Sequence, residues 1–145
     1  WAINRDPNHF FYKTETETEL HIVPADAAVA FLRDNPDVMY DLLARIYKGT
    51  EGLLGRLVHL MSGTAQSRLM YELILEGRRF GQAEQDGSVV LAINEGDLAA
   101  RTGLSRETVS REVSKLKDRN LVTIAPKNLR ILDMSALEQA LGGEV

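Results

Sequence analysis

The sequence predicts a mainly α fold of the α+β class, in which a long helix precedes a C-terminal winged helix-turn-helix. Three observations predict it. Apolar residues recur at every seventh position over residues 39–60, and a capped helix, a glycine turn and a second capped helix follow over 94–120. A strand–turn–strand pattern comes directly after them, over 121–132.

The composition is that of a folded globular chain. Of 145 residues, 44% are hydrophobic and 26% are charged. No apolar run approaches the roughly 18–20 residues of a membrane-spanning helix, so we expect no membrane partner and a cytoplasmic location. The first residue is Trp1, and no signal segment follows it, which suggests that the chain begins inside a longer protein.

No pattern in the sequence predicts an enzyme or a metal site. The chain has no cysteine, and its three histidines (His9, His21 and His59) lack the spacing of a helical metal pair. We find no paired carboxylates in an apolar setting, no glycine-rich phosphate loop before a helix and no Ser–His–Asp context. We therefore expect no catalytic residues, no metal and no cofactor in this chain.

Charge is distributed unevenly along the chain. The net charge is −4, but residues 95–132 carry eight basic and five acidic side chains, a local balance of +3. An acidic chain with one basic segment is compatible with local nucleic-acid contact. An ordinary solvated surface explains the charge alone about equally well.

The N-terminal part combines strand patterns with a short helix. Residues 10–12 and 14–23 are rich in aromatic and β-branched residues, and the second stretch alternates Thr with Glu, which predicts strands with one wet face. Two strands are marginal alone, so we expect them to belong to a larger sheet. A short helix over 25–33 begins after Pro24 and ends before Pro36.

The long helix is predicted over residues 37–59. A strict seven-residue apolar repeat is typical of a helix that pairs with another helix, and we favour self-pairing over packing on its own domain. Glycines at 49, 52 and 55 interrupt the helix and also allow close approach of a second backbone. The predicted dimer interface consists of the apolar side chains on this stripe, Met39, Leu42, Ile46, Leu53, Leu57 and Leu60.

A second helix is predicted over 65–76, then a polar loop between Gly77 and Gly87, then a short strand over 88–93. Asn94 is a suitable N-cap for the next helix, which runs to Arg101. Gly103 provides the backbone freedom of a tight turn. Ser105 then caps a helix to about Asp118, whose buried stripe is Val109, Val113 and Leu116.

The exposed side of that last helix carries the predicted DNA chemistry. Its first turns would lie against base edges in a major groove. Arginine bonds guanine at two atoms, and glutamate accepts from the cytosine amine. The alternative is a set of surface charges that includes a Glu107–Arg111 pair. We favour base reading, and the predicted base-reading residues are Arg106, Glu107, Ser110 and Arg111.

The hairpin after this helix is predicted as a wing with strands over 121–124 and 129–132. The predicted phosphate contacts lie on the wing and the recognition helix; they are Ser105, Thr108, Lys115, Lys127 and Arg130. Residues 135–138 read S-A-L-E, a capping box that predicts a short terminal helix.

The stretch GLSRETVSREVSKLKDRNLV, residues 103–122, resembles the helix-turn-helix signature of the cyclic-AMP receptor / fumarate-nitrate regulator (CRP/FNR) family of bacterial transcription factors. FLRDNPDV, residues 31–38, resembles the hinge into the family's dimerisation helix, and residues 1–23 resemble the last strands of its sensor β-roll. The resemblance implies three domains: a remnant of the effector-sensing β-roll over 1–36, the dimerisation helix over 37–62 and the winged helix-turn-helix over 63–145.

The same resemblance implies partners and an effector. It implies a homodimer on palindromic double-stranded DNA, and the E-x-x-S-R motif of Glu107, Ser110 and Arg111 resembles the branch that reads TTGAT half-sites, so we expect a site like TTGAT-N4-ATCAA. The loop over 77–87 lies where family members touch RNA polymerase. A nucleotide-contacting Thr-Ser pair aligns with Leu53 and Leu54, which argues against cyclic AMP as effector and leaves the effector unknown. Glu112 departs from the family's apolar residue.

One alternative function stays open. A winged helix can also serve as a protein–protein interaction module without DNA affinity, with its basic face against an acidic partner. That reading predicts no salt-dependent DNA binding, whereas a DNA-binding regulator predicts it. The E-x-x-S-R spacing on the exposed face favours the regulator.

Overall fold

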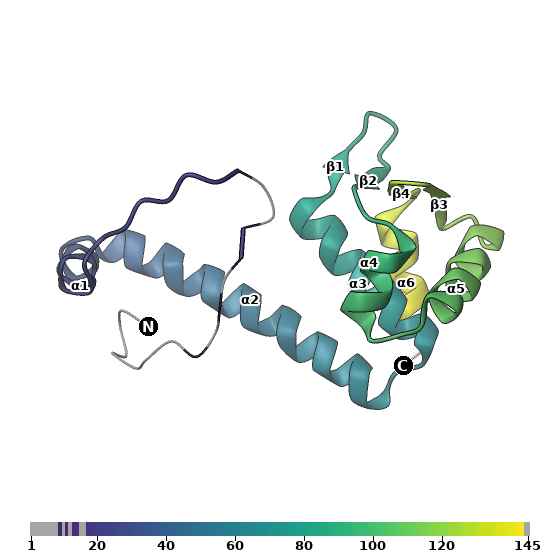
Figure 1. The fold of residues 1–145 in the computed structure, drawn as a ribbon, viewed down its shortest axis with the longest axis horizontal. Coiled ribbons are helices and arrows are strands. Elements are labelled where there is room, and N and C mark those ends of the chain that lie inside the picture. Colours follow the sequence, from purple (N-terminus) through teal and green to yellow (C-terminus); the bar gives the residue numbers. More distant parts are fainter. Residues whose placement is uncertain (1–8, 10, 12, 15–16, 144–145) are drawn as a thin grey trace. The chain divides into compact units, whose positions relative to one another are not determined.

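The computed structural model describes residues 9, 11, 13, 14 and 17–143 (Figure 1). The chain divides into two compact units, Trp1–Gly49 and Thr50–Val145, each described by itself. Mainly α structure with one small antiparallel sheet confirms the predicted fold class. In this described part of the chain, none of the helices combines the length and the apolarity needed to cross a membrane.

The first unit contains helix α1 (Ala25–Asp34) and the beginning of helix α2 (Pro36–Ser62). Pro24 precedes α1, and Pro36 is the first residue of α2, where its fixed φ and missing N–H are tolerated. Between them, the Asn35 side-chain amide donates to the Phe31 carbonyl at 2.8 Å and satisfies a free carbonyl at the end of α1. The predicted interruption between two helices is therefore confirmed, and α2 continues beyond its predicted end at residue 59.

The predicted N-terminal strands are not formed in the described residues. Residue 14 and residues 17–23 have no strand structure and are exposed, so the prediction is wrong for them. Most of the 10–12 stretch and residues 15–16 lie outside the described residues. Alternating polarity makes a strand only where a partner ladder satisfies the backbone and a core covers one face. The described residues offer this segment neither.

The second unit packs helices against a four-stranded antiparallel sheet of strand order β1-β2-β4-β3 (Figure 1). Helix α3 contacts β2, α4, α5 and α6 and forms its centre. The elements after α2 are α3 (Ala65–Phe80), β1 (Gln82–Ala83), β2 (Val89–Leu91), α4 (Glu95–Thr102), α5 (Arg106–Asp118), β3 (Val122–Ala125), β4 (Asn128–Ile131) and α6 (Met134–Gly142).

The helix-turn-helix forms as predicted. Asn94 caps α4 with a complete capping box, in which its side chain accepts from the Asp97 N–H and the Asp97 side chain accepts from the Asn94 N–H. Gly103 ends α4 with φ +67°, the left-handed region that favours glycine. Ser105 then caps α5, and the predicted stripe of Val109, Val113 and Leu116 is fully buried in the core.

Three local expectations differ from the structure. Helix α3 continues through Gly77 to Phe80, and the Met134 side chain packs where a side chain at Gly77 would lie. The segment after it contains the short strand β1, which pairs with β2. Helix α6 is capped by Asp133, whose carboxylate accepts from the Ala136 N–H at 3.0 Å, and not by Ser135.

Candidate nucleic-acid interface

Helix α5 has one buried and one exposed face. The buried stripe packs into the core of the second unit, while all four predicted base-reading side chains, Arg106, Glu107, Ser110 and Arg111, are exposed. The fold therefore places these four side chains on the free side of one capped helix. That side presents guanidinium, carboxylate and hydroxyl groups, which are the groups that read base edges.

The first turn of α5 is held by its own cap. The Ser105 hydroxyl accepts from the Thr108 N–H at 3.1 Å and donates to the Thr108 hydroxyl at 3.0 Å. Both predicted phosphate-contacting hydroxyls are thus engaged with each other, and Thr108 is half-buried. Their hydrogen bonds fix the start of the helix, near which positive partial charge favours an anion.

Arg106 lies against the start of α4. Its Nη2 would be 2.8 Å from a Cβ on Gly96, so glycine at 96 leaves room for the guanidinium. A surface hollow of about 490 Å³ is lined there by Arg106, by residues 94–96 of α4's first turn and by residues 124–126 of the wing. The structure thus brings one predicted base-reading residue to the junction of α4, α5 and the wing.

The carboxylate of Glu112 is buried and contacts two predicted DNA-contacting residues, Arg111 and Lys115. Glu112 is only 3% exposed, and the Lys115 ammonium donates to both of its oxygens at 2.9 Å. Arg111 Nε lies 3.5 Å from the same carboxylate. Glu112 therefore takes an apolar position because basic side chains of its own helix neutralise it.

The two basic residues of the wing have different surroundings. Lys127 lies exposed in the turn between β3 and β4. Arg130 Nη1 instead donates to the Ser88 hydroxyl at 2.9 Å and lies 3.4 Å from an Asp86 oxygen. Hydrogen bonds from Ser88, with the charge of Arg130, lower the pKa of Asp86 below its usual value. Arg130 thus has a structural partner at the turn between β1 and β2, inside the predicted polymerase loop.

The predicted dimer-interface side chains of α2 are mostly exposed. In the first unit, Met39 and Ile46 are exposed and Leu42 is half-buried. In the second unit, Leu53, Leu57 and Leu60 are all exposed by about half or more. Three apolar neighbours outside the predicted interface, Leu54, Val58 and Met61, are exposed as well.

Two of the three α2 glycines serve a contact inside the second unit. Gly52 is buried, and a Cβ added to it would lie 3.1 Å from a side-chain carbon of Leu75 on α3. The Tyr71 side chain occupies the space that a Cβ on Gly55 would need. The Tyr71 hydroxyl donates to the Gly52 carbonyl at 3.3 Å. These glycines therefore allow α3 to approach α2. The sequence predicted that a second backbone could come close at these glycines, but not that this backbone is α3.

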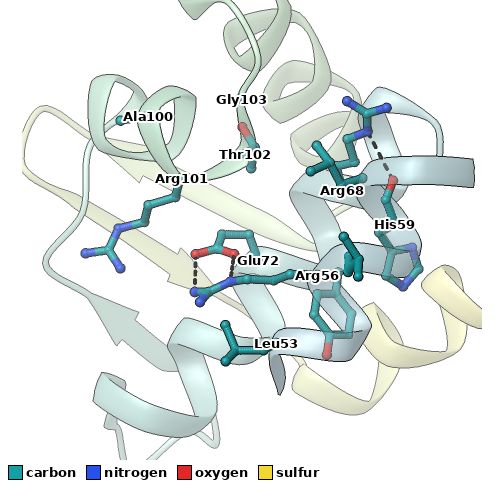
Figure 2. Close-up of a pocket in the computed structure, with 12 residues that line it drawn as sticks. Leu53, Arg56, His59, Arg68, Glu72, Ala100, Arg101, Thr102 and Gly103 are labelled. Carbon is teal, nitrogen blue, oxygen red and sulfur yellow. Dashed lines mark hydrogen bonds and ion pairs between the residues drawn. The ribbon is translucent and has the colours of Figure 1, made fainter. Parts of the chain in front are cut away.

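The sequence did not predict a cluster of ion pairs around two buried carboxylates in the second unit. Arg56 of α2 makes two 2.7 Å hydrogen bonds to Glu72 of α3, which Figure 2 shows as paired dashed lines. Arg101 of α4 reaches Glu76 at 2.8 Å. The pair with Glu72 raises the pKa of Arg56. The only sequence signal was two acidic residues one turn apart on the apolar face of a helix.

Beside this cluster lies an open hollow of about 380 Å³ (Figure 2). Residues 53–60 of α2 form one side, residues 68–72 of α3 another, and residues 100–103 at the end of α4 a third. The Arg68 side chain donates to the His59 carbonyl at 3.1 Å, and the His59 ring lies against Tyr71 with 4.7 Å between centroids. No group of three or more potential metal ligands occurs among the residues that the structure describes.

Comparison with known proteins matches this architecture. Residues 67–140, just over half of the chain, match the family model of the Crp-like helix-turn-helix domain. The global nitrogen regulator of Synechocystis sp. is 30% identical over 129 residues, which are 86% of this chain and 56% of the relative. The nitrogen fixation regulation protein FixK of Azorhizobium caulinodans is 30% identical over 134 residues, 88% of this chain and 54% of the relative.

A solved structure shows the same fold. The chain is similar to a CRP/FNR-family transcriptional regulator from Thermus thermophilus, with a TM-score of 0.62 and 22% identity over 77% of this chain and 57% of that chain. The chain spans about half the length of the curated relatives it matches.

Proposed function

Because this chain belongs to the CRP/FNR family through its Crp-like helix-turn-helix domain, we propose that it regulates transcription by binding a palindromic DNA site as a homodimer. In this proposal α5 lies in the major groove, and the wing follows the adjacent backbone. The observation that carries it is the free face of α5, where Arg106, Glu107, Ser110 and Arg111 are exposed together on a helix fixed by the core.

The base-reading part of the proposal rests on the first turns of α5. Glu107, Ser110 and Arg111 lie three and four residues apart, which places them on one side of the helix. Arg111 supplies a bidentate donor for guanine, and Glu107 supplies an acceptor for cytosine. The E-x-x-S-R motif that they form resembles that of the family branch that reads TTGAT, which supports a half-site related to TTGAT.

The phosphate-contact part rests most on Lys127, which is exposed. Lys115 and Arg130 form ion pairs with Glu112 and Asp86. Each would therefore exchange a carboxylate partner for a phosphate on binding DNA. The exchange lowers their net contribution to affinity, because one charged partner replaces another. Ser105 and Thr108 complete the set at the start of α5.

The homodimer part rests on α2. Exposed apolar side chains on α2 are costly in water unless another surface covers them. The seven-residue spacing from Met39 to Leu60 suits a second copy of the same helix. The proposal keeps three functional regions: 1–36 as the end of a sensor, 37–62 as the dimerisation helix and 63–145 as the DNA-binding domain.

Fluorescence anisotropy tests the function directly. A labelled duplex that carries TTGAT-N4-ATCAA is titrated with the chain over a salt series, beside a scrambled duplex of equal length. The proposal predicts tighter, salt-dependent binding of the palindrome with two chains per duplex. Salt-dependent binding without selectivity would overturn the half-site. No salt-dependent binding of either duplex would favour a protein-binding module.

A further inference from the structure

A connected set of ion pairs joins three helices of the second unit. We name Arg56, Glu72, Glu76 and Arg101 the α3 carboxylate cluster. Arg56 of α2 holds Glu72 at 2.7 Å through two nitrogens, and its Nη2 also lies 3.4 Å from Glu76 Oε1. Arg101 of α4 reaches that same Glu76 oxygen at 2.8 Å. Glu76 is therefore the acceptor shared between α2 and α4.

The two carboxylates need both arginines. The Glu72 and Glu76 side chains are only 3% and 6% exposed, and they lie one helical turn apart on α3. Two such like charges repel, and each loses hydration on burial. The guanidinium groups of Arg56 on α2 and Arg101 on α4 offset both the repulsion and the lost hydration. Apolar residues of similar size commonly serve stability as well as a buried ion pair does, so stability alone explains the cluster poorly.

Geometry is what an ion pair adds to apolar packing. Apolar burial is roughly proportional to area and has no direction, whereas a guanidinium–carboxylate pair fixes both groups in distance and angle. Helix α4 is short, and only three residues, 103–105, separate it from α5. A shift of α4 is therefore passed to the start of α5, where the proposed base-reading residues lie.

We propose that Glu76 is a positioning residue for DNA binding, which holds α4 through Arg101 and so sets α5 against the part of α2 that Arg56 occupies. The inference rests on the proposed function. Glu76 touches no DNA in this scheme, and it acts through Arg101 and the turn at Gly103.

A neutral residue at position 76 distinguishes a positioning role of Glu76 from a simple effect of its charge on DNA binding. Glu76→Gln removes one negative charge, which by electrostatics alone tightens DNA binding slightly. Positioning predicts the opposite, a loss of affinity for the palindrome of about fivefold or more. Glu84→Gln is the matched control, since Glu84 is an exposed acid in the turn between β1 and β2. Anisotropy titrations of both variants that agree within error would overturn the proposal.

Arg101 provides a second variant that the fold tolerates more readily, because its side chain is 43% exposed. Arg101→Gln is expected to weaken palindrome binding while the slope of log affinity against log salt stays that of the wild type. A direct phosphate contact would lower the slope by about one, and that result would overturn the positioning role. Arg101→Lys keeps a cation for Glu76 and is expected to restore part of the affinity.

Hydrogen exchange tests the cluster without DNA. Amides of α4 in Arg101→Gln are expected to exchange faster than in the wild type, while those of the β3–β4 hairpin are unchanged. Equal exchange in α4 would overturn the inference. If the wild type binds no DNA, the proposed function fails by itself, and exchange still decides whether the cluster holds α4.

Discussion

At the scale of single residues, the DNA-facing side chains differ in how freely they can act. Arg106, Glu107, Ser110 and Arg111 are exposed on α5. Lys115 is held by the buried carboxylate of Glu112, with two contacts of 2.9 Å. Arg111 Nε also lies 3.5 Å from Glu112, a longer contact than those of Lys115, so Arg111 is expected to exchange its carboxylate for DNA more readily than Lys115.

Arg111 is expected to carry base specificity. Arg111→Ala should lower affinity for the palindrome by about 1–3 kcal/mol, because a bidentate contact to one base is lost. Anisotropy with the specific and the scrambled duplex measures the difference. Arg119→Ala removes the same charge just beyond α5 and should weaken both duplexes alike. An equal loss on both duplexes for Arg111→Ala would remove its assigned role.

Lys127 is expected to act on the backbone and not on sequence. Lys127→Ala should weaken the specific and the scrambled duplex by the same factor and lower the salt slope by about one. Titrations over a series of salt concentrations give that slope. An unchanged slope would show that the wing tip lies away from the phosphates.

At the scale of elements, the turn between α4 and α5 depends on one backbone conformation. Gly103 has φ +67°, and a Cβ placed there would have no atom within 4 Å. Any cost of a side chain at this position is therefore conformational and not steric. The sequence pattern predicts such a glycine, since the chain must change direction sharply within a short turn between two helices.

Gly103→Ala should lower the free energy of unfolding by roughly 1–2 kcal/mol, the cost of the left-handed conformation for a residue with a Cβ. Urea unfolding followed by circular dichroism measures it. Gly142→Ala is the matched control, because it too has open space but no positive φ, and it should be neutral or slightly stabilising. Equal effects at both sites would contradict the conformational explanation.

At the scale of the whole molecule, the proposed dimer depends on α2. Among its exposed apolar side chains, those from Met39 to Leu60 recur every seven residues, which a single helix packed on its own domain does not require. The half-site arrangement of a palindrome also needs two copies related by a twofold axis. Dimer formation and palindrome recognition should therefore fail together.

Ile46→Glu should raise the dimer dissociation constant at least about tenfold, equal to about 1.4 kcal/mol, because two charges would face an apolar seam. Analytical ultracentrifugation measures it. Ala44→Glu is the control, because Ala44 is also exposed but lies two residues from Ile46, on the opposite side of the helix from the stripe. Similar dissociation constants for both variants would place the interface elsewhere.

Local patterns in the sequence were enough to predict the helix-turn-helix. The caps at Asn94 and Ser105, the turn at Gly103 and the buried stripe from Val109 to Leu116 all occur as predicted. Each depends on residues within a few positions of one another, through a side-chain–backbone hydrogen bond, a φ preference or helical periodicity. These local interactions can therefore be predicted without knowledge of the tertiary structure.

Tertiary structure alone decided which distant residues meet. Arg56 pairs with Glu72, 16 residues away in the sequence, and Arg130 pairs with Asp86, 44 residues away. The packing of helices and strands brings these positions together. The same dependence explains why residues 17–23 form no strand: their alternation needs a partner that local sequence cannot supply. Sequence alone thus determined the local elements and the exposed face of α5. Only the fold could decide that two buried carboxylates of α3 join α2 to α4, since a buried charge is stable only where its counter-charge arrives in space.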